Sequence, residues 1–161
     1  MSKSQEKKQS KRPQLRFNES EIKLALSVMG QLEKPIELMY YLMERENEES
    51  FVIIFLSGTG VEIESIIKLE KRDTDLLYTL DKGSNLFALI CQETKVDGAY
   101  RFAERLMRNL VLNNASEIYC SELEVRSTKH PVQEVIFKSI ENYNKMKKDK
   151  KENEIIFHSL S

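Results

Sequence analysis

The sequence lacks any apolar stretch long enough to cross a bilayer. No apolar run is longer than Phe51 to Leu56, whereas a transmembrane helix needs about 20 residues. The N-terminus also lacks the apolar core of a signal peptide, so we expect a cytoplasmic protein with no membrane span. A strong charge of either sign is missing too. Because the formal net charge is -1, no global field for binding nucleic acid is expected.

Metal ligands and thiols are equally scarce. The two cysteines, Cys91 and Cys120, lie in apolar, strand-like segments, and the chain has only two histidines, His130 and His158. These four residues show no spacing typical of a metal site. We therefore predict no bound metal and no cofactor, with both cysteines reduced in the core.

The residues that are abundant support one domain with a well-solvated surface. The 161 residues are 40% hydrophobic and 32% charged, a composition typical of a globular chain. Residues 1–17 are predicted to form a disordered basic arm and residues 18–161 a single domain. A solubilising tail is the simpler interpretation of the arm, and a contact with nucleic acid or a membrane surface is the alternative.

Apolar periodicity and turn residues predict an alternation of helices and strands. The predicted helices are 18–30, with Asn18 as N-cap, 61–69, 99–111 and 131–143. The predicted strands are 36–43, 51–56, 76–80, 86–91, 118–125 and 155–157, of which 36–43 could instead be helical. The Gly58-Thr59-Gly60 stretch lacks the Lys-Ser/Thr ending of a phosphate-binding loop and is interpreted as a strand-to-helix turn. This order favours an α+β fold, in which helices flank a central, mainly antiparallel sheet.

One segment carries a family resemblance. The stretch DKGSNLFALICQETKVDGAYRFAERLMRNL contains a turn, an apolar strand, a Thr-containing loop and a helix with Ala103-Glu104-Arg105. In order and spacing it resembles the GGDEF-domain family of diguanylate cyclases. The runs KPIELMYYLME and IENYNKMKKDKKENEIIF resemble that family's first strand and its last helix and strand. The resemblance covers roughly residues 18–158 and implies a palm-like, nucleotidyl cyclase type of fold.

The signature turn departs from the family pattern. It reads Gly83-Ser84-Asn85-Leu86-Phe87, with Asn85-Leu86 in place of an acidic pair, and the aspartate expected in the first strand falls near Leu42, beside Glu44. In the family, carboxylates at these positions hold the metal ions that stabilise the transferring phosphate. The departures imply a domain with no catalytic residues and no cyclase activity.

Arg72 and Asp75 form an Arg-x-x-Asp motif directly before the hairpin that the predicted strands 76–80 and 86–91 would form. Many GGDEF proteins use this motif, with another arginine in the following helix, to bind cyclic di-GMP, and Arg105 matches that arginine. The resemblance implies that Arg72 contacts a guanine edge or a phosphate, Asp75 accepts guanine donors and Arg105 adds a second cation. Seven residues separate Asp75 from Gly83, where the family usually has five. Without the resemblance, the interpretation is purely structural: Arg72 and Asp75 end a helix and form an i,i+3 ion pair, and Arg105 is solvated.

Two hypotheses from different functional classes follow. The first is a catalytically inactive, bacterial cyclic di-GMP receptor that passes the signal to an unknown protein partner, similar to the receptor subunit of Pel polysaccharide secretion. The second is a ligand-free module that keeps the fold for dimerisation or scaffolding. An active cyclase is a distant third. The sequence identifies neither the partner nor the oligomeric state, and a homodimer is compatible with both hypotheses.

Overall fold

A computed structural model describes residues 17–45, 49–92 and 94–160 of the chain. The predicted basic arm lies outside these residues except for Phe17. The elements are, in chain order, α2 (Glu19–Arg45), β1 (Phe51–Thr59), α3 (Ile63–Glu70), β2 (Asp75–Asp81), β3 (Leu86–Cys91), α4 (Val96–Leu112), β4 (Ser116–Val125), α5 (Val132–Lys148) and β5 (Glu154–Leu160). No helix within the described ranges is long and apolar enough to span a membrane.

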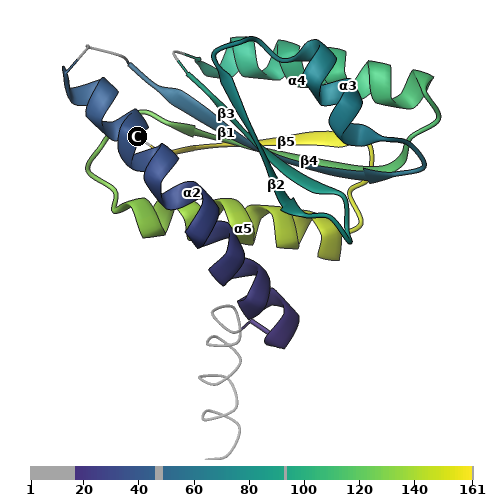
Figure 1. Ribbon diagram of the computed structural model, residues 1–161, viewed down its shortest axis with the longest axis horizontal. Helices are drawn as coiled ribbons and strands as arrows, with labels where there is room; N and C mark the ends of the chain where they lie inside the picture. Colours follow the sequence, from purple (N-terminus) through teal and green to yellow (C-terminus); the bar gives the residue numbers. More distant parts are fainter. Residues whose placement is uncertain (1–16, 46–48, 93, 161) are drawn as a thin grey trace, which may run out of the picture.

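The strands form one sheet in the order β2-β3-β1-β4-β5. Neighbouring strands are antiparallel except for β4 and β5, which run parallel. Helices α2 and α5 cover one face of the sheet, and α3 and α4 cover the other (Figure 1). This arrangement confirms the predicted α+β fold with a mainly antiparallel central sheet.

The central strand β1 is buried on both faces, and its alternating side chains divide the core in two. Phe51, Ile53 and Phe55 point towards α2 and α5, whereas Val52 and Ile54 belong to the cluster under α3 and α4. A strand covered on both faces needs apolar residues at every position. This requirement explains the uninterrupted run from Phe51 to Leu56.

Residues 36–43 do not form a strand. The helical alternative is confirmed, and the predicted helix end at residue 30 was wrong, because α2 continues as one helix to Arg45. The buried side chains of α2 recur at helical spacing on both sides of Pro35: Ala25, Val28, Leu32, Ile36 and Met39. Packing of this stripe on the sheet outweighs the loss of one helical hydrogen bond at Pro35. The predicted N-cap is confirmed, since Asn18 Oδ1 accepts from the Glu21 amide at 2.9 Å and Glu21 Oε1 accepts from the Asn18 amide at 3.1 Å.

Among the other elements, the hairpin of β2 and β3 and the helices α3, α4 and α5 form where the sequence predicted them. The Gly58–Gly60 stretch is the end of a strand and the turn into α3, as expected. Both cysteines are free, buried thiols, as expected. The predicted strands 36–43 and 51–56 do not pair as a hairpin, because residues 36–43 are helical and β1 pairs instead with β3 and β4.

A buried carboxyl group lies in β4. Glu122 is 0% exposed, and neither of its carboxyl oxygens has a hydrogen-bond partner among the described residues. Burial raises the pKa of Glu122 from 4.5 to about 8, because an apolar environment disfavours the charged form. The group is therefore mostly protonated at neutral pH.

Candidate functional site

The turn from Arg72 to Asp75 joins α3 to β2, and the Asp75 side chain closes it. The Asp75 amide donates to the Arg72 carbonyl at 3.0 Å, and the Arg72 amide donates to Asp75 Oδ2 at 2.9 Å. The Asp75 side chain is 2% exposed. The carboxylate thus fixes the backbone on which the Arg72 side chain is mounted.

The Arg72 guanidinium connects this turn to the loop between β3 and α4. Its Nη2 lies 2.8 Å from Asp75 Oδ1, and Nε donates to the same carboxylate at 3.1 and 3.3 Å. Nη2 also donates to Thr94 Oγ1 at 2.7 Å and to the Gln92 carbonyl at 3.0 Å. The Arg72 side chain remains 52% exposed. Arg72 is therefore held in one orientation while part of it faces solvent.

Arg105 approaches from α4 and is also held in place. Its Nε lies 2.9 Å from Glu70 Oε2, with the side chain 50% exposed, and its guanidinium carbon lies 5.4 Å from the centre of the Phe102 ring. Glu70 accepts a further hydrogen bond from the Asn109 amide group. The end of α3 and the middle of α4 are thereby locked together around Arg105.

These side chains border a single pocket of about 450 Å³, which we call the Arg72 pocket. It is lined by Arg72, Asp75, Cys91, Thr94, Lys95, Gly98, Ala99, Arg101, Phe102 and Arg105. The structure therefore brings together all three residues singled out in the sequence. Four of the lining side chains are cationic, and the one carboxylate is paired with Arg72. The pocket has the size of a small-molecule site and an excess of positive charge.

Sequence reasoning did not single out Lys95, Arg101 or Phe102. Lys95 is paired with Glu49 at 2.6 Å, whereas no ion pair of Arg101 is found within the described ranges. A signal for Arg101 was present, because it shares the polar side of α4 with Arg105, opposite the apolar stripe. Its place in the pocket depends on how α4 packs.

The Cys91 thiol lies in the pocket wall but is not a candidate nucleophile. Burial, with the nearby Asp75 carboxylate as a smaller cause, raises the pKa of Cys91 far above its ordinary value. A thiol is reactive as the thiolate, so Cys91 is a structural residue.

The turn between β2 and β3 offers little that could hold a metal. Leu86, which stands where the family has an acidic residue, is 1% exposed and packs in the core. Asn85 Nδ2 donates to the Gly58 carbonyl at 3.3 Å. The Asp81 carboxylate accepts from the Gly83 amide at 3.1 Å and from Ser84 Oγ at 2.8 Å. No group of three potential metal-binding side chains is found in the part of the chain that the structure describes.

The assignment of the first-strand aspartate to the neighbourhood of Leu42 was wrong. Leu42 and Glu44 lie in α2, and the first strand is β1, whose end next to the turn reads Ser57-Gly58-Thr59. Ser57 Oγ accepts a hydrogen bond from the Tyr143 hydroxyl at 2.6 Å. The corrected strand end therefore carries hydroxyl groups and no carboxylate.

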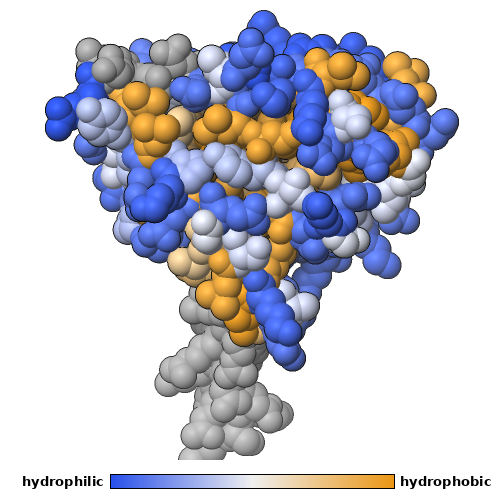
Figure 2. All heavy atoms as spheres, in the orientation of Figure 1, coloured by the Kyte–Doolittle hydropathy of each residue, from blue (hydrophilic) through white to orange (hydrophobic). Residues whose placement is uncertain are grey.

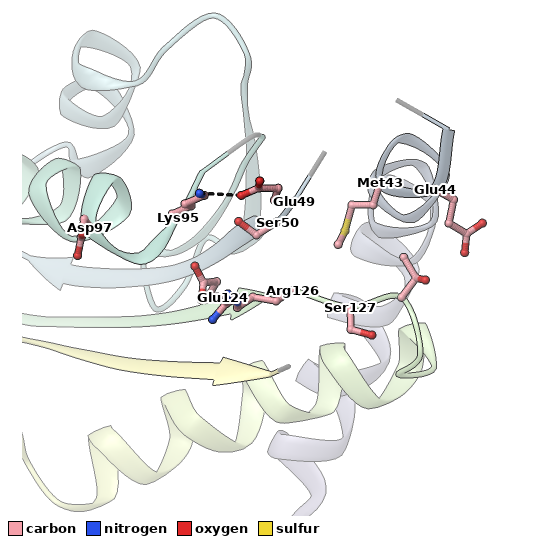
Figure 3. A pocket seen from close by; sticks show the side chains of 10 residues that line it. Met43, Glu44, Glu49, Ser50, Lys95, Asp97, Glu124, Arg126 and Ser127 are labelled. Atoms are coloured by element: carbon pink, nitrogen blue, oxygen red, sulfur yellow. Dashed lines mark ion pairs between the residues drawn. The ribbon is translucent and has the colours of Figure 1, made fainter. Parts of the chain in front are cut away.

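A second, larger cavity of about 790 Å³ lies where β1 begins. Figure 3 shows Met43 and Glu44 at the end of α2 on one side of it and Lys95 paired with Glu49 on the other. Arg126 lies 3.9 Å from the buried Glu124. The cavity has an excess of negative charge, because its lining carries four carboxylates, Glu44, Glu49, Asp97 and Glu124, against the two cations Lys95 and Arg126. None of Arg72, Asp75 and Arg105 lines it.

No protein-family model matches the sequence, and no curated protein matches it either. Solved structures match the fold. The diguanylate cyclase SiaD of Pseudomonas aeruginosa, solved in complex with its activator SiaC, superimposes with a TM-score of 0.62 at 15% identity over 80% of this chain, which spans 57% of the SiaD chain. The GGDEF domain of FimX from P. aeruginosa gives a TM-score of 0.61 at 6% identity, covering 81% of this chain and 92% of that one. The GGDEF domain of DgcB from Caulobacter crescentus, in complex with c-di-GMP, gives 0.58 at 9% identity, covering 75% and 84%. The protein therefore has a GGDEF-like fold.

Proposed function

We propose that the protein is a catalytically inactive, GGDEF-like receptor that binds cyclic di-GMP in the Arg72 pocket. The observation that carries this proposal is that Arg72, Asp75 and Arg105, from two segments of the chain, line the same pocket. A fold similar to that of DgcB, which was solved in complex with c-di-GMP, supports the choice of ligand.

The charge and shape of the pocket suit a cyclic dinucleotide. Its two phosphates need cations, and Arg101 and Arg105 on consecutive turns of α4 supply guanidinium groups beside Arg72. A guanidinium forms paired hydrogen bonds with a phosphate or with the Hoogsteen edge of guanine. Because Arg72 and Arg105 are already oriented by Asp75 and Glu70, binding requires little reordering of these side chains.

For Asp75 we propose a different role from the one inferred from the sequence. Its carboxylate is buried and accepts from the Arg72 side chain and the Arg72 amide. In this geometry Asp75 positions Arg72, and guanine donors could reach the carboxylate only if Arg72 moved. We therefore assign the direct ligand contacts to the arginines.

The proposed loss of cyclase activity rests on the turn after β2 and on the end of β1. A neutral Asn85, a core Leu86 and the hydroxyls of Ser57 and Thr59 leave no pair of carboxylates there to hold two magnesium ions. Metal-assisted phosphoryl transfer depends on such ions to balance the developing charge.

A ligand-free interaction module is the second candidate, and a specific observation favours it. Both Arg72 and Arg105 already make internal ion pairs, which would serve a purely structural role as well. Under either function the domain acts through a protein partner. SiaD was solved with its activator SiaC, a precedent among proteins of similar fold.

Calorimetry with cyclic di-GMP separates the two functions, with GMP as the comparison ligand. The receptor proposal predicts a Kd of about 1 μM, equivalent to a binding free energy of about -8 kcal/mol. Arg72→Ala should weaken binding most and Arg105→Ala next, each by about 1.5–3 kcal/mol for a lost charge-assisted contact. Arg108→Ala is the matched control, since it removes an arginine from α4 that does not line the pocket. Absence of binding at millimolar ligand would leave the interaction module as the function.

A further inference from the structure

The outer edge of β5 is an open sheet edge. Within the described ranges β5 pairs only with β4, in seven consecutive residue pairs without a register shift. Its sequence, EIIFHSL, has no lysine, arginine, proline or glycine. Ile155, Ile156, Phe157 and His158 are all half-buried. Apolar side chains and backbone hydrogen-bonding groups are thus exposed together along one strand.

The opposite edge of the sheet, strand β2, is better protected against pairing with another chain. Strand β2 carries an aspartate at each end and an irregular register between Thr79 and Asp81, and α2 packs against it. Charges and bulges are common devices that prevent a sheet edge from pairing with another chain. Since β5 has neither device along its middle, its edge is suited to receive a further strand.

The two sides of the β5 edge differ in chemistry. On the α4 side, a groove of about 410 Å³ lies between α4 and the start of β5. Its apolar walls are Tyr100, Met107 and Ile155, and its charged residues, Glu104, Arg108 and Glu154, include both signs. The strip of Tyr100, Met107 and Ile155 offers apolar contacts to the side chains of an added strand, beside charged groups of both signs and Asn153.

The side facing α5 is basic. Lys138 and Lys145 of α5 lie near His158 in β5. Burial and, to a smaller extent, the positive charges of these two lysines lower the pKa of His158. Lys145, Lys147 and Lys148 form the last turn of α5, shortly before β5 begins. This side favours acidic side chains.

We propose that the β5 edge binds an extended segment of a partner protein as an added strand, with apolar residues facing α4 alternating with acidic residues facing α5. In a strand, successive side chains point to opposite faces, so one alternating segment satisfies both sides. Backbone hydrogen bonds supply affinity in this mode, and the side-chain pockets supply specificity. A second copy of the chain is a poorer occupant. Antiparallel pairing of two β5 strands would place Lys138 and Lys145 of both copies on the same side of the joined sheet.

The test uses a fluorescent seven-residue peptide in which glutamate and valine alternate, matched in length to β5, and a control peptide with lysine in place of glutamate. Fluorescence anisotropy should give a Kd below about 1 mM for the acidic peptide and much weaker binding for the basic one. Hydrogen exchange should slow at the β5 amides when the acidic peptide binds. The double variant Lys138→Glu/Lys145→Glu should weaken binding at least about tenfold. Lys23→Glu/Lys34→Glu, the same charge change on α2, should leave it unchanged.

Several results would overturn the proposal. These are no binding of the acidic peptide, equal binding of both peptides, protection outside β5, and equal weakening by the two double variants. Sedimentation showing a dimer that the Lys138→Glu/Lys145→Glu variant strengthens would assign the edge to a second copy of the chain instead.

Discussion

Replacing the buried carboxyl group of β4 by an amide tests whether the core holds Glu122 protonated. Burial raises the pKa of Glu122 from 4.5 to about 8 in the folded protein. Below pH 4.5 the group is protonated in both folded and unfolded chains and has no effect on stability. Between these two values the unfolded chain releases a proton that the folded chain retains, so stability falls as the pH rises.

The size of the effect follows from the difference between the two pKa values. Each pH unit in this range lowers the free energy of unfolding by about 1.4 kcal/mol. The loss is about 3 kcal/mol at pH 7 and levels off near about 5 kcal/mol above pH 8. Glu122→Gln keeps the shape of the side chain and removes its titration. The variant should therefore match the parent within about 1 kcal/mol near pH 5 and exceed its stability by about 3 kcal/mol near pH 7.

Urea unfolding followed by far-UV circular dichroism measures this difference, since the chain has no tryptophan for fluorescence. Subtracting the variant's stability from the parent's at each pH cancels the other titrating groups. Glu117→Gln, at an exposed position of the same strand, is the control and should retain the parent's pH dependence. A parent-minus-variant difference that stays constant from about pH 5 to pH 8 would refute the reasoning.

Three further predictions concern activity and backbone geometry. Incubation with GTP and Mg²⁺ or Mn²⁺ should yield no cyclic di-GMP, and product that disappears on Asn85→Ala would instead reveal a working site at the turn. Pro35→Ala should raise the free energy of unfolding by about 1–3 kcal/mol, because it restores a donor inside α2; an unchanged urea midpoint would contradict this. Gly60→Ala should lower the free energy of unfolding by about 1–3 kcal/mol, since Gly60 has a φ of 91° and an added Cβ would lie 2.9 Å from the Asn114 carbonyl oxygen. Thermal unfolding of that variant at the parental temperature would show that the turn relaxes.

Much of the fold was predictable from local patterns. Periodicity located α3, α4 and α5, and the turn residues between two apolar runs located the hairpin of β2 and β3. The strand prediction for residues 36–43 failed because a short apolar run that follows Pro35 fits a strand or a helix equally well by itself. Only packing against the sheet showed that Ile36 and Met39 continue the buried stripe of α2.

For the candidate site, the sequence determined which residue types are available, and the tertiary structure decided which of them meet. Arg72 and Asp75 are three residues apart, so their pairing is local. Arg105 is far away in sequence and reaches the same pocket only because α4 packs beside α3 and the sheet. The burial of Glu122 could not be predicted from its own strand, because the carboxyl group would be solvated if the sheet face to which it points were open. It is buried because β4 lies inside the sheet and both faces are covered by helices, a condition that depends on the whole chain.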